Sequence, residues 1–271
     1  MRATGNIRKM KSTLGEVVEY TLPLFNILEP HEEIPLNQFV GKDISLRFEN
    51  EINCVITGQK IKKTYGDGMS FKAFQSSPLA VESIIRPELS RIHEGIALRD
   101  KEWEEAHHNT PHVTYVSLTS GLKVGVTRTT QIPTRWIDQG AVEAVLLAET
   151  PYRQAAGLIE VSLKKHVADK TNWRNMLKNE FTNSMGILEM KKKLTSLIPD
   201  DLKQFISDKN EVTKINFPVI EYPQKLTSIK LDKVPVIEKK LMGIKGQYLI
   251  FDDNTVMNLR SHTAYKITIE A

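Results

Sequence analysis

The sequence has little cysteine and no long apolar run. Cys54 is the single cysteine among 271 residues. One thiol excludes a disulfide within the chain and is typical of proteins in the reducing cytoplasm. No apolar stretch approaches the roughly eighteen residues of a membrane span. Glu16 and Glu19 interrupt the segment behind the basic first ten residues, so a secretory signal is not expected. We therefore expect a cytoplasmic protein without a membrane partner.

The sequence also lacks a strong charge of either sign. Lysine and arginine number 37 against 33 acidic residues, a net charge of +4. This excess is compatible with a nucleic-acid partner but is too small to indicate one. The basic residues gather in short runs, which usually form solvated surface. These runs are Lys60, Lys62 and Lys63; Lys164 and Lys165; Lys191 to Lys193; and Lys239 and Lys240.

The pattern along residues 1–110 predicts a β-rich N-terminal region. Residues 15–24 and 43–49 approach the alternation of polar and apolar side chains that strands have. Pro30 and Pro35 are interpreted as turns between these strands. Residues 54–110 break into short, turn-rich pieces, and a segment this irregular needs an added constraint such as a metal or close packing on a neighbour.

Residues 111–180 are predicted to form a small central α/β domain. Its elements are strands at 112–118 and 122–127, a helix from Pro133 to near Gly140, a strand at 142–148 and a helix at 152–167. The first two strands should be antiparallel neighbours, because a three-residue link cannot make a crossover. Residues 181–216 read as a helical connector. Residues 217–271 return to a strand pattern and predict a small C-terminal sheet or barrel that packs back on the central domain. The fold class is α+β.

Three residues of the central region suit phosphodiester chemistry, which needs stabilised phosphoryl oxygens and an activated water. Arg135 could bind a scissile phosphate with two hydrogen bonds. Glu160 could supply the carboxylate that Mg²⁺ or Mn²⁺ uses. Tyr115 could hold or deprotonate the attacking water if a cation lowered its pKa. Each also has a structural interpretation: an ion pair for Arg135, a helical pair with Lys164 for Glu160, and a core aromatic for Tyr115.

The order of these elements and residues resembles the GIY-YIG nuclease module. Val113-Thr114-Tyr115 sits where GIY would be, and Lys123-Val124-Gly125 sits where YIG would be. The resemblance implies that Tyr115 is the first motif tyrosine, Arg135 the phosphate-binding arginine and Glu160 the metal ligand. Lys123 replaces the second motif tyrosine. It could act as a cation on phosphate, or it could mark a descendant without turnover.

The chain is also similar, over nearly its whole length, to a bacterial family called domain of unknown function 2797. The runs that carry this similarity are Gly121–Arg128, Gln131–Ala141, Asp169–Trp173, Gly246–Ile250 and Asn258–Arg260. Typical relatives carry cysteine pairs that look like zinc sites. Here Cys54 remains, and the other positions correspond to Thr57, Ser70, Ala73, Ser83, Ser90 and His108. Structural zinc needs about four sulfur or nitrogen ligands, so no structural zinc is expected and residues 54–110 are interpreted as a degenerate zinc ribbon.

The leading hypothesis is a nucleic-acid-acting protein, a Mg²⁺-dependent endonuclease for which DNA is favoured over RNA. Its site would consist of Tyr115, Lys123, Arg135 and Glu160, with Glu160 holding the metal. The alternatives are a nucleic-acid-binding module without turnover and a protein-interaction scaffold. The nuclease hypothesis requires Tyr115, Arg135 and Glu160 to converge in space.

Overall fold

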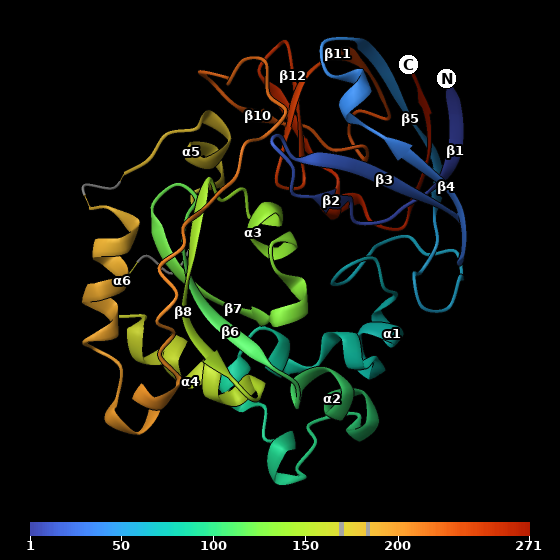
Figure 1. Ribbon diagram of the computed structural model, residues 1–271. Coiled ribbons are helices and arrows are strands. Elements are labelled where there is room, and N and C mark those ends of the chain that lie inside the picture. The colour runs from blue at the N-terminus through green and yellow to red at the C-terminus, as the bar shows by residue number, and fades with distance from the viewer. Residues whose placement is uncertain (168–170, 183–184) are drawn as a thin grey trace. The chain divides into compact units, whose positions relative to one another are not determined.

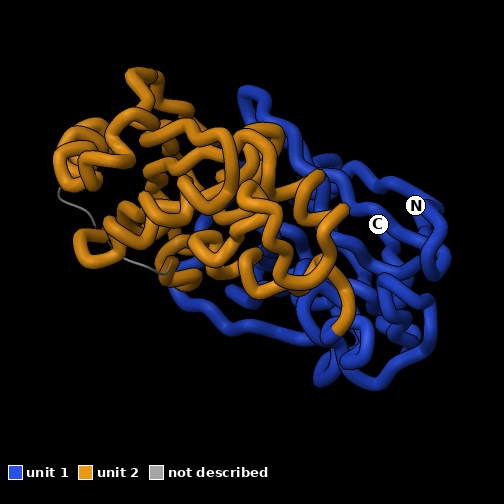
Figure 2. The backbone as a smooth tube through the Cα atoms, turned by 90° about the horizontal axis from the view of Figure 1, so that it is seen from below, with its two compact units in different colours: residues 1–75, 216–271 blue, residues 76–215 orange. Residues whose placement is uncertain are grey.

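The computed structural model describes residues 1–167, 171–182 and 185–271 (Figure 1). It has a mixed α+β fold, as predicted, and divides into two compact units. Unit 1 contains residues 1–75 and 216–271, and unit 2 contains residues 76–215. Unit 2 is one continuous segment of the sequence, and the two segments of unit 1 precede and follow it along the chain; Figure 2 colours the two units separately. Within the described residues, no helix is both long enough and apolar enough to span a bilayer.

A single sheet forms the framework of unit 1. Its strands are β1 (Arg2–Ile7), β2 (Lys11–Thr13), β3 (Glu19–Asn26), β4 (Glu29–Pro35), β5 (Asp43–Ile52), β10 (Thr227–Ser228), β11 (Val236–Lys245), β12 (Tyr248–Phe251), β13 (Thr255–Asn258) and β14 (Tyr265–Glu270). Their order is β10-β13-β12-β11-β5-β14-β1-β3-β2, and β4 pairs with β3. The short helix α1 (Phe71–Ser76) follows the strands of the N-terminal part.

Both ends of the chain contribute to this sheet. β5 lies between β11 and β14, with Arg47 opposite Val236 on one side and Thr268 on the other. The sequence-based division treats residues 1–110 and 217–271 as separate regions. The structure joins them, because the apolar residues of β14, such as Ile267 and Ile269, are buried between N-terminal strands.

The interpretation of Pro30 and Pro35 as turns is wrong, because both lie within β4. A proline inside a sheet removes a backbone donor, so it is tolerated where the strand has a neighbour on one side only. β4 meets that condition, since β3 is its one partner among the described strands.

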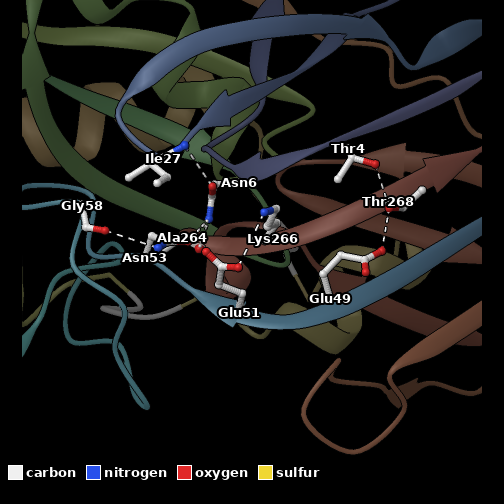
Figure 3. Close-up of polar contacts among 10 residues, drawn as sticks. All are labelled: Thr4, Asn6, Ile27, Glu49, Glu51, Asn53, Gly58, Ala264, Lys266 and Thr268. Carbon is white, nitrogen blue, oxygen red and sulfur yellow. Dashed lines mark hydrogen bonds and ion pairs between the residues drawn. The ribbon is translucent and has the colours of Figure 1, made fainter.

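The buried side chain of Asn6 joins β1 to three other segments of unit 1 (Figure 3). The Asn6 side chain donates to Asn53 Oδ1 and to the carbonyl of Ala264, both at 2.9 Å, and accepts from the backbone amide of Ile27 at 3.1 Å. Ile27 and Ala264 both have positive φ angles, 59° and 86°. Residues with a Cβ avoid this conformation, so the Asn6 hydrogen bonds offset part of its cost.

Unit 2 is built on a four-stranded sheet in the order β7-β6-β8-β9. Its strands are β6 (His112–Leu118), β7 (Leu122–Arg128), β8 (Glu143–Thr150) and β9 (Thr213–Lys214). Its α-helices are α2 (Lys101–His108), α3 (Thr134–Asp138), α4 (Arg153–Leu163), α5 (Trp173–Lys178) and α6 (Ile187–Thr195). β6 and β7 form an antiparallel hairpin, which confirms the prediction for these segments.

The two faces of this small sheet pack against different helices. Val116 on β6 belongs to a buried apolar cluster with Ile159 and Leu163 of α4 and Leu194 of α6. Side chains alternate between faces along a strand, so Tyr115 points to the other face. There its ring contacts Trp136 of α3, with the centroids 5.9 Å apart. The hairpin therefore lies between α3 and α4, which carry Arg135 and Glu160.

The lysine run on α6 is not uniformly solvated as predicted. Lys192 and Lys193 are exposed, but Lys191 is buried and donates to the carbonyl of Lys209. Lys191 is next to Met190 on the side of α6 that faces the core, and this position explains why its side chain is buried. Residues 183 and 184 of the predicted helical connector lie outside the described residues.

Candidate functional site

The side chain of Tyr115 on β6 crosses the neighbouring strand β7 at a glycine. Its cross-strand partner is Gly125, and the Tyr115 side chain is fully buried. A Cβ atom placed on Gly125 would lie 2.6 Å from the Tyr115 hydroxyl oxygen and 2.7 Å from the ring carbon that carries it. The position therefore requires glycine, because only a residue without a side chain lets the phenol cross β7. β7 is the outer strand of the sheet, so the hydroxyl reaches the sheet edge.

Two residues of the α3 region hold the Tyr115 hydroxyl. It donates to Gln139 Oε1 at 3.0 Å, just after α3 ends. The Arg135 guanidinium, on α3 itself, is hydrogen-bonded to the same hydroxyl. Helix α3 begins after Pro133 and ends before Gly140, whose φ of 70° suits glycine. This local sequence sets the angle at which Arg135 approaches Tyr115.

Burial raises the pKa of the Tyr115 hydroxyl, and the negative charge of Glu160 adds to this increase. The positive charge of Arg135 and its hydrogen bond act in the opposite direction but do not outweigh burial. The sequence hypothesis let Tyr115 deprotonate water only if a cation lowered its pKa. In the structure the phenol is a neutral group that donates one hydrogen bond and accepts another.

Glu160 reaches the site from α4. It is half-buried, and its charge acts on both Tyr115 and Arg153. Arg135 in turn acts on Tyr115 and on Arg153. Arg135 and Glu160 thus both act electrostatically on Tyr115. Lys123 lies opposite Ser117, two residue pairs along the hairpin from Tyr115 and therefore on the same face.

Two further arginines belong to this site and were not singled out from the sequence. The Arg153 guanidinium donates to the carbonyls of Ser83 and Ile84, both at 2.8 Å. Burial lowers the pKa of Arg153 to about 10; Glu160 opposes this decrease, while Arg135 and Arg128 reinforce it. Arg128 ends β7, three residues after Gly125. The sequence signal that could have identified Arg128 is its position three residues after the YIG-like run.

The pKa values of two buried histidines, His108 and His112, are affected by the positive charge at the same end of the hairpin. Burial is the largest cause that lowers the pKa of His108 to about 3 and of His112 to about 4. The charges of Arg153 and Arg128 lower both values further. His112 Nδ1 lies 2.7 Å from the carbonyl of Thr110, so this nitrogen carries the proton of the neutral ring.

The residues at the cysteine positions of typical relatives gather in two places, one in each unit. In unit 1 the backbone amide of Ser70 donates to Cys54 Sγ at 3.2 Å, and Thr57 also hydrogen-bonds to this thiol. In unit 2 the hydroxyls of Ser83 and Ser90 lie 3.4 and 3.3 Å from His108 Nδ1. Hydroxyl, thiol and imidazole groups are thus hydrogen-bonded to one another or to the backbone.

The purified protein is expected to contain no stoichiometric zinc and to keep its fold in a chelator. Zinc is bound by thiolate, imidazole or carboxylate groups, and serine and threonine hydroxyls are poor substitutes. Elemental analysis and thermal unfolding with and without EDTA test this prediction. About one zinc per chain, or a melting temperature that falls in EDTA, would contradict it.

The donor set at Tyr115, Arg135 and Glu160 has one carboxylate. In the part of the chain that the structure describes, no three histidine, cysteine or acidic side chains are grouped to hold a metal. Mg²⁺ fits such a site when water and substrate phosphate complete its coordination, because it keeps several waters and uses one or two carboxylates. Arg135 and Arg153 oppose a cation that arrives without a phosphate.

Comparison with known protein families gives a match over most of the chain. The family described as "Protein of unknown function (DUF2797)" matches residues 41–267, which include the hairpin, α3 and α4. Of the runs that carry the resemblance, Asp169 and Lys170 lie outside the described residues. No curated protein and no solved structure matches the chain. Because the match spans most of its length, the chain belongs to the DUF2797 family.

Proposed function

We propose that the protein binds nucleic acid and cleaves phosphodiester bonds at the site formed by Tyr115, Arg135 and Glu160, with Mg²⁺ or Mn²⁺ as cofactor. The observation that carries the proposal is that Arg135 of α3 and Glu160 of α4 both act electrostatically on the buried Tyr115 hydroxyl of β6. The proposal also draws on the resemblance of the sequence to the GIY-YIG module, from which these residues were identified. The single buried thiol favours the cytoplasm as the place of action.

Arg135 is the residue that would bind the scissile phosphate. Its one hydrogen bond within the described residues is to the Tyr115 hydroxyl, and no carboxylate pairs with it there. A guanidinium has five N–H donors, so most of them remain for an anion. Two parallel hydrogen bonds to phosphoryl oxygens would orient the phosphate and stabilise the charge that develops during attack.

Glu160 is the residue that would hold the metal. A divalent cation there supplies Lewis-acid activation of water and charge neutralisation at the phosphate. Glu160 also acts electrostatically on Arg153, which anchors the start of α4 to Ser83 and Ile84. The carboxylate therefore sits on a helix fixed at its start, which limits its movement.

Tyr115 would position the attacking water rather than remove its proton. A buried phenol with a raised pKa stays protonated near neutrality, so its oxygen offers a hydrogen-bond acceptor. Gln139 takes the phenol proton and fixes the direction of the remaining lone pairs. Lys123, on the same face of the hairpin, would add positive charge for the phosphate.

Binding of nucleic acid without turnover is the second candidate. The observation that favours it is the occupation of the Tyr115 hydroxyl by Gln139 and Arg135, together with lysine in place of the second motif tyrosine. Both candidates use the basic residues. They differ in whether Glu160 and a divalent cation produce cleavage.

Supercoiled plasmid incubated with the protein and Mg²⁺ or Mn²⁺ is expected to be nicked or linearised. Glu160→Gln and Glu160→Ala should each lower the rate by at least about a hundredfold, because charge stabilisation of this kind contributes about 3 kcal/mol. Glu180→Gln is the matched control, since Glu180 lies in the same unit, is exposed and pairs with Lys178.

Cleavage by wild type and the Glu180 variant but not by the Glu160 variants would support catalysis. Absence of cleavage by wild-type protein that still binds DNA would favour the binding module. Equal cleavage by all variants would assign the activity to another site or to a contaminant.

A further inference from the structure

A pocket of about 500 Å³ lies in unit 1 beside strands β3 and β4. Its walls are formed by these two strands and by the residues that follow β1, and Val55 and Thr263 also line it. The volume is within the range of about 300–1,000 Å³ that sites for small organic ligands have. All of the lining residues belong to unit 1, so the pocket is complete within one compact unit.

Arg8, which follows β1, provides a positive charge in this pocket. Its side chain is half-buried, and the guanidinium lies over the Phe25 ring, 4.4 Å from the ring centroid. Nη1 donates to the carbonyl of Ile7 at 3.2 Å, and Nη2 donates to that of Ile27 at 2.6 Å. These contacts fix the guanidinium in one orientation. A guanidinium has five N–H donors, so others remain for a ligand, and no carboxylate pairs with Arg8 in the part of the chain that the structure describes.

The other charged side chains of the pocket compensate one another. Two of the three acidic side chains that line it are in ion pairs, Glu33 with Lys11 and Asp67 with Arg260. The third, Glu32, is matched in charge by Lys9, which also lines the pocket. The positive charge of Arg8 is therefore in excess, and an anion bound beside it would balance this charge.

Apolar groups form much of the remaining wall. Pro23, Phe25 and Pro30 contribute rings, and Val55 contributes a branched side chain. Arginine stacks on flat rings through its planar guanidinium, as Arg8 does on Phe25. A flat ring bound in the pocket would bury apolar surface against these groups, whereas an inorganic anion would leave that surface in contact with water.

We infer that this pocket binds an organic anion that carries a planar ring, with the carboxylate or phosphate on Arg8 and the ring against Phe25, Pro30 and Val55. Both parts of the ligand contribute. A ring without charge leaves the half-buried guanidinium uncompensated, and a charge without a ring gains nothing from the apolar wall. The inference does not depend on the proposed function, because the residues of the proposed nuclease site all belong to unit 2.

Isothermal titration calorimetry of the full chain in EDTA, with four probes, tests the inference. Adenosine 5′-monophosphate and indole-3-acetate each combine a planar ring with an anionic group. Adenosine has the ring alone, and inorganic phosphate has the anionic group alone. At least one of the first two probes should bind at one site per chain, about tenfold or more tighter than adenosine or phosphate. The tighter of the two shows whether the pocket prefers phosphate or carboxylate.

Three variants assign the binding to this pocket. Arg8→Gln should weaken it about tenfold or more, and Arg8→Lys should recover part of the loss, because lysine keeps the charge without the planar pair of donors. Val55→Phe should also weaken binding, because the larger side chain fills the apolar part of the pocket. Arg2→Ala is the matched control, since Arg2 lies on β1 of the same unit, pairs with Glu270 and does not line the pocket. It should stay within about twofold of wild type.

Thermal unfolding of each variant ensures that only folded protein is compared. If Arg8→Gln does not fold, Arg8→Lys and Val55→Phe decide the result. The inference is overturned if neither ring-bearing anion binds wild-type protein, if phosphate alone binds as tightly as they do, or if the folded Arg8 and Val55 variants bind like Arg2→Ala. Failure of the proposed function is a different result, because an absence of plasmid cleavage leaves binding at Arg8 unchanged.

Discussion

Replacing Arg135 with alanine is expected to lower the rate of single-turnover DNA cleavage about a hundredfold. Loss of a charged donor to the phosphoryl oxygens costs about 3 kcal/mol in transition-state stabilisation. The structure adds a second loss, because Arg135 also donates to the Tyr115 hydroxyl. Rates measured with excess protein over a labelled duplex, in saturating Mg²⁺, separate this effect from weaker binding.

Arg135→Lys divides the two contributions. Lysine keeps the charge but loses the planar pair of donors, so it should recover part of the affinity and little of the rate. Arg91→Ala serves as the control, because it removes the same charge from unit 2 at an arginine that pairs with Glu94. If Arg135→Ala cleaves at the wild-type rate, Arg135 is structural and the similarity to the nuclease module concerns the fold alone.

Replacing Gly157 with alanine is expected to destabilise unit 2 by about 3 kcal/mol. A Cβ atom there would lie 2.3 Å from the backbone nitrogen of Glu88 and 2.6 Å from the carbonyl carbon of Pro87. These are backbone atoms and cannot swing away like the end of a side chain, so α4 and the segment around Pro87 must separate. Overpacking of this kind costs about 1–3 kcal/mol or more.

Urea unfolding followed by circular dichroism measures the difference, with Gly186→Ala as control. Gly186 precedes α6, and among the described residues no atom beyond its chain neighbours lies within 4 Å of the place that a Cβ would take there. That variant should lie within about 0.5 kcal/mol of wild type. Equal stability of the two variants would show that the close packing of α4 on residues 87 and 88 does not exist in solution.

Local patterns predicted much of unit 2 because its elements follow one another along the chain. The β6–β7 hairpin, α3 and α4 appear where periodicity and turn residues indicate them. Unit 1 was less predictable. The bounds of β11 were not predicted, because Lys239 and Lys240 interrupt its apolar alternation, and its central position depends on β5 from the other end of the chain.

The same contrast applies to the site. Tyr115, Arg135 and Glu160 were identified from their order in a motif, and the charges of Arg135 and Glu160 act on the Tyr115 hydroxyl. The motif did not show that Gln139 would accept the Tyr115 proton. Nor did it show that Arg153 would bond to carbonyls some seventy residues earlier. Such contacts depend on packing between distant segments, which periodicity and spacing do not record.

Unit 1 is formed from both ends of the chain, and this affects how the protein folds during its synthesis. A nascent chain emerges from the ribosome with β5 long before β11, although Arg47 must pair with Val236. Unit 2, a continuous segment, can fold during this interval, since domains generally fold as units during translation. Until β11 and β14 arrive, β5 presents unpaired backbone on both sides, a template for wrong partners. Interrupted translation within unit 2 is therefore expected to yield fragments that depend on chaperones or aggregate.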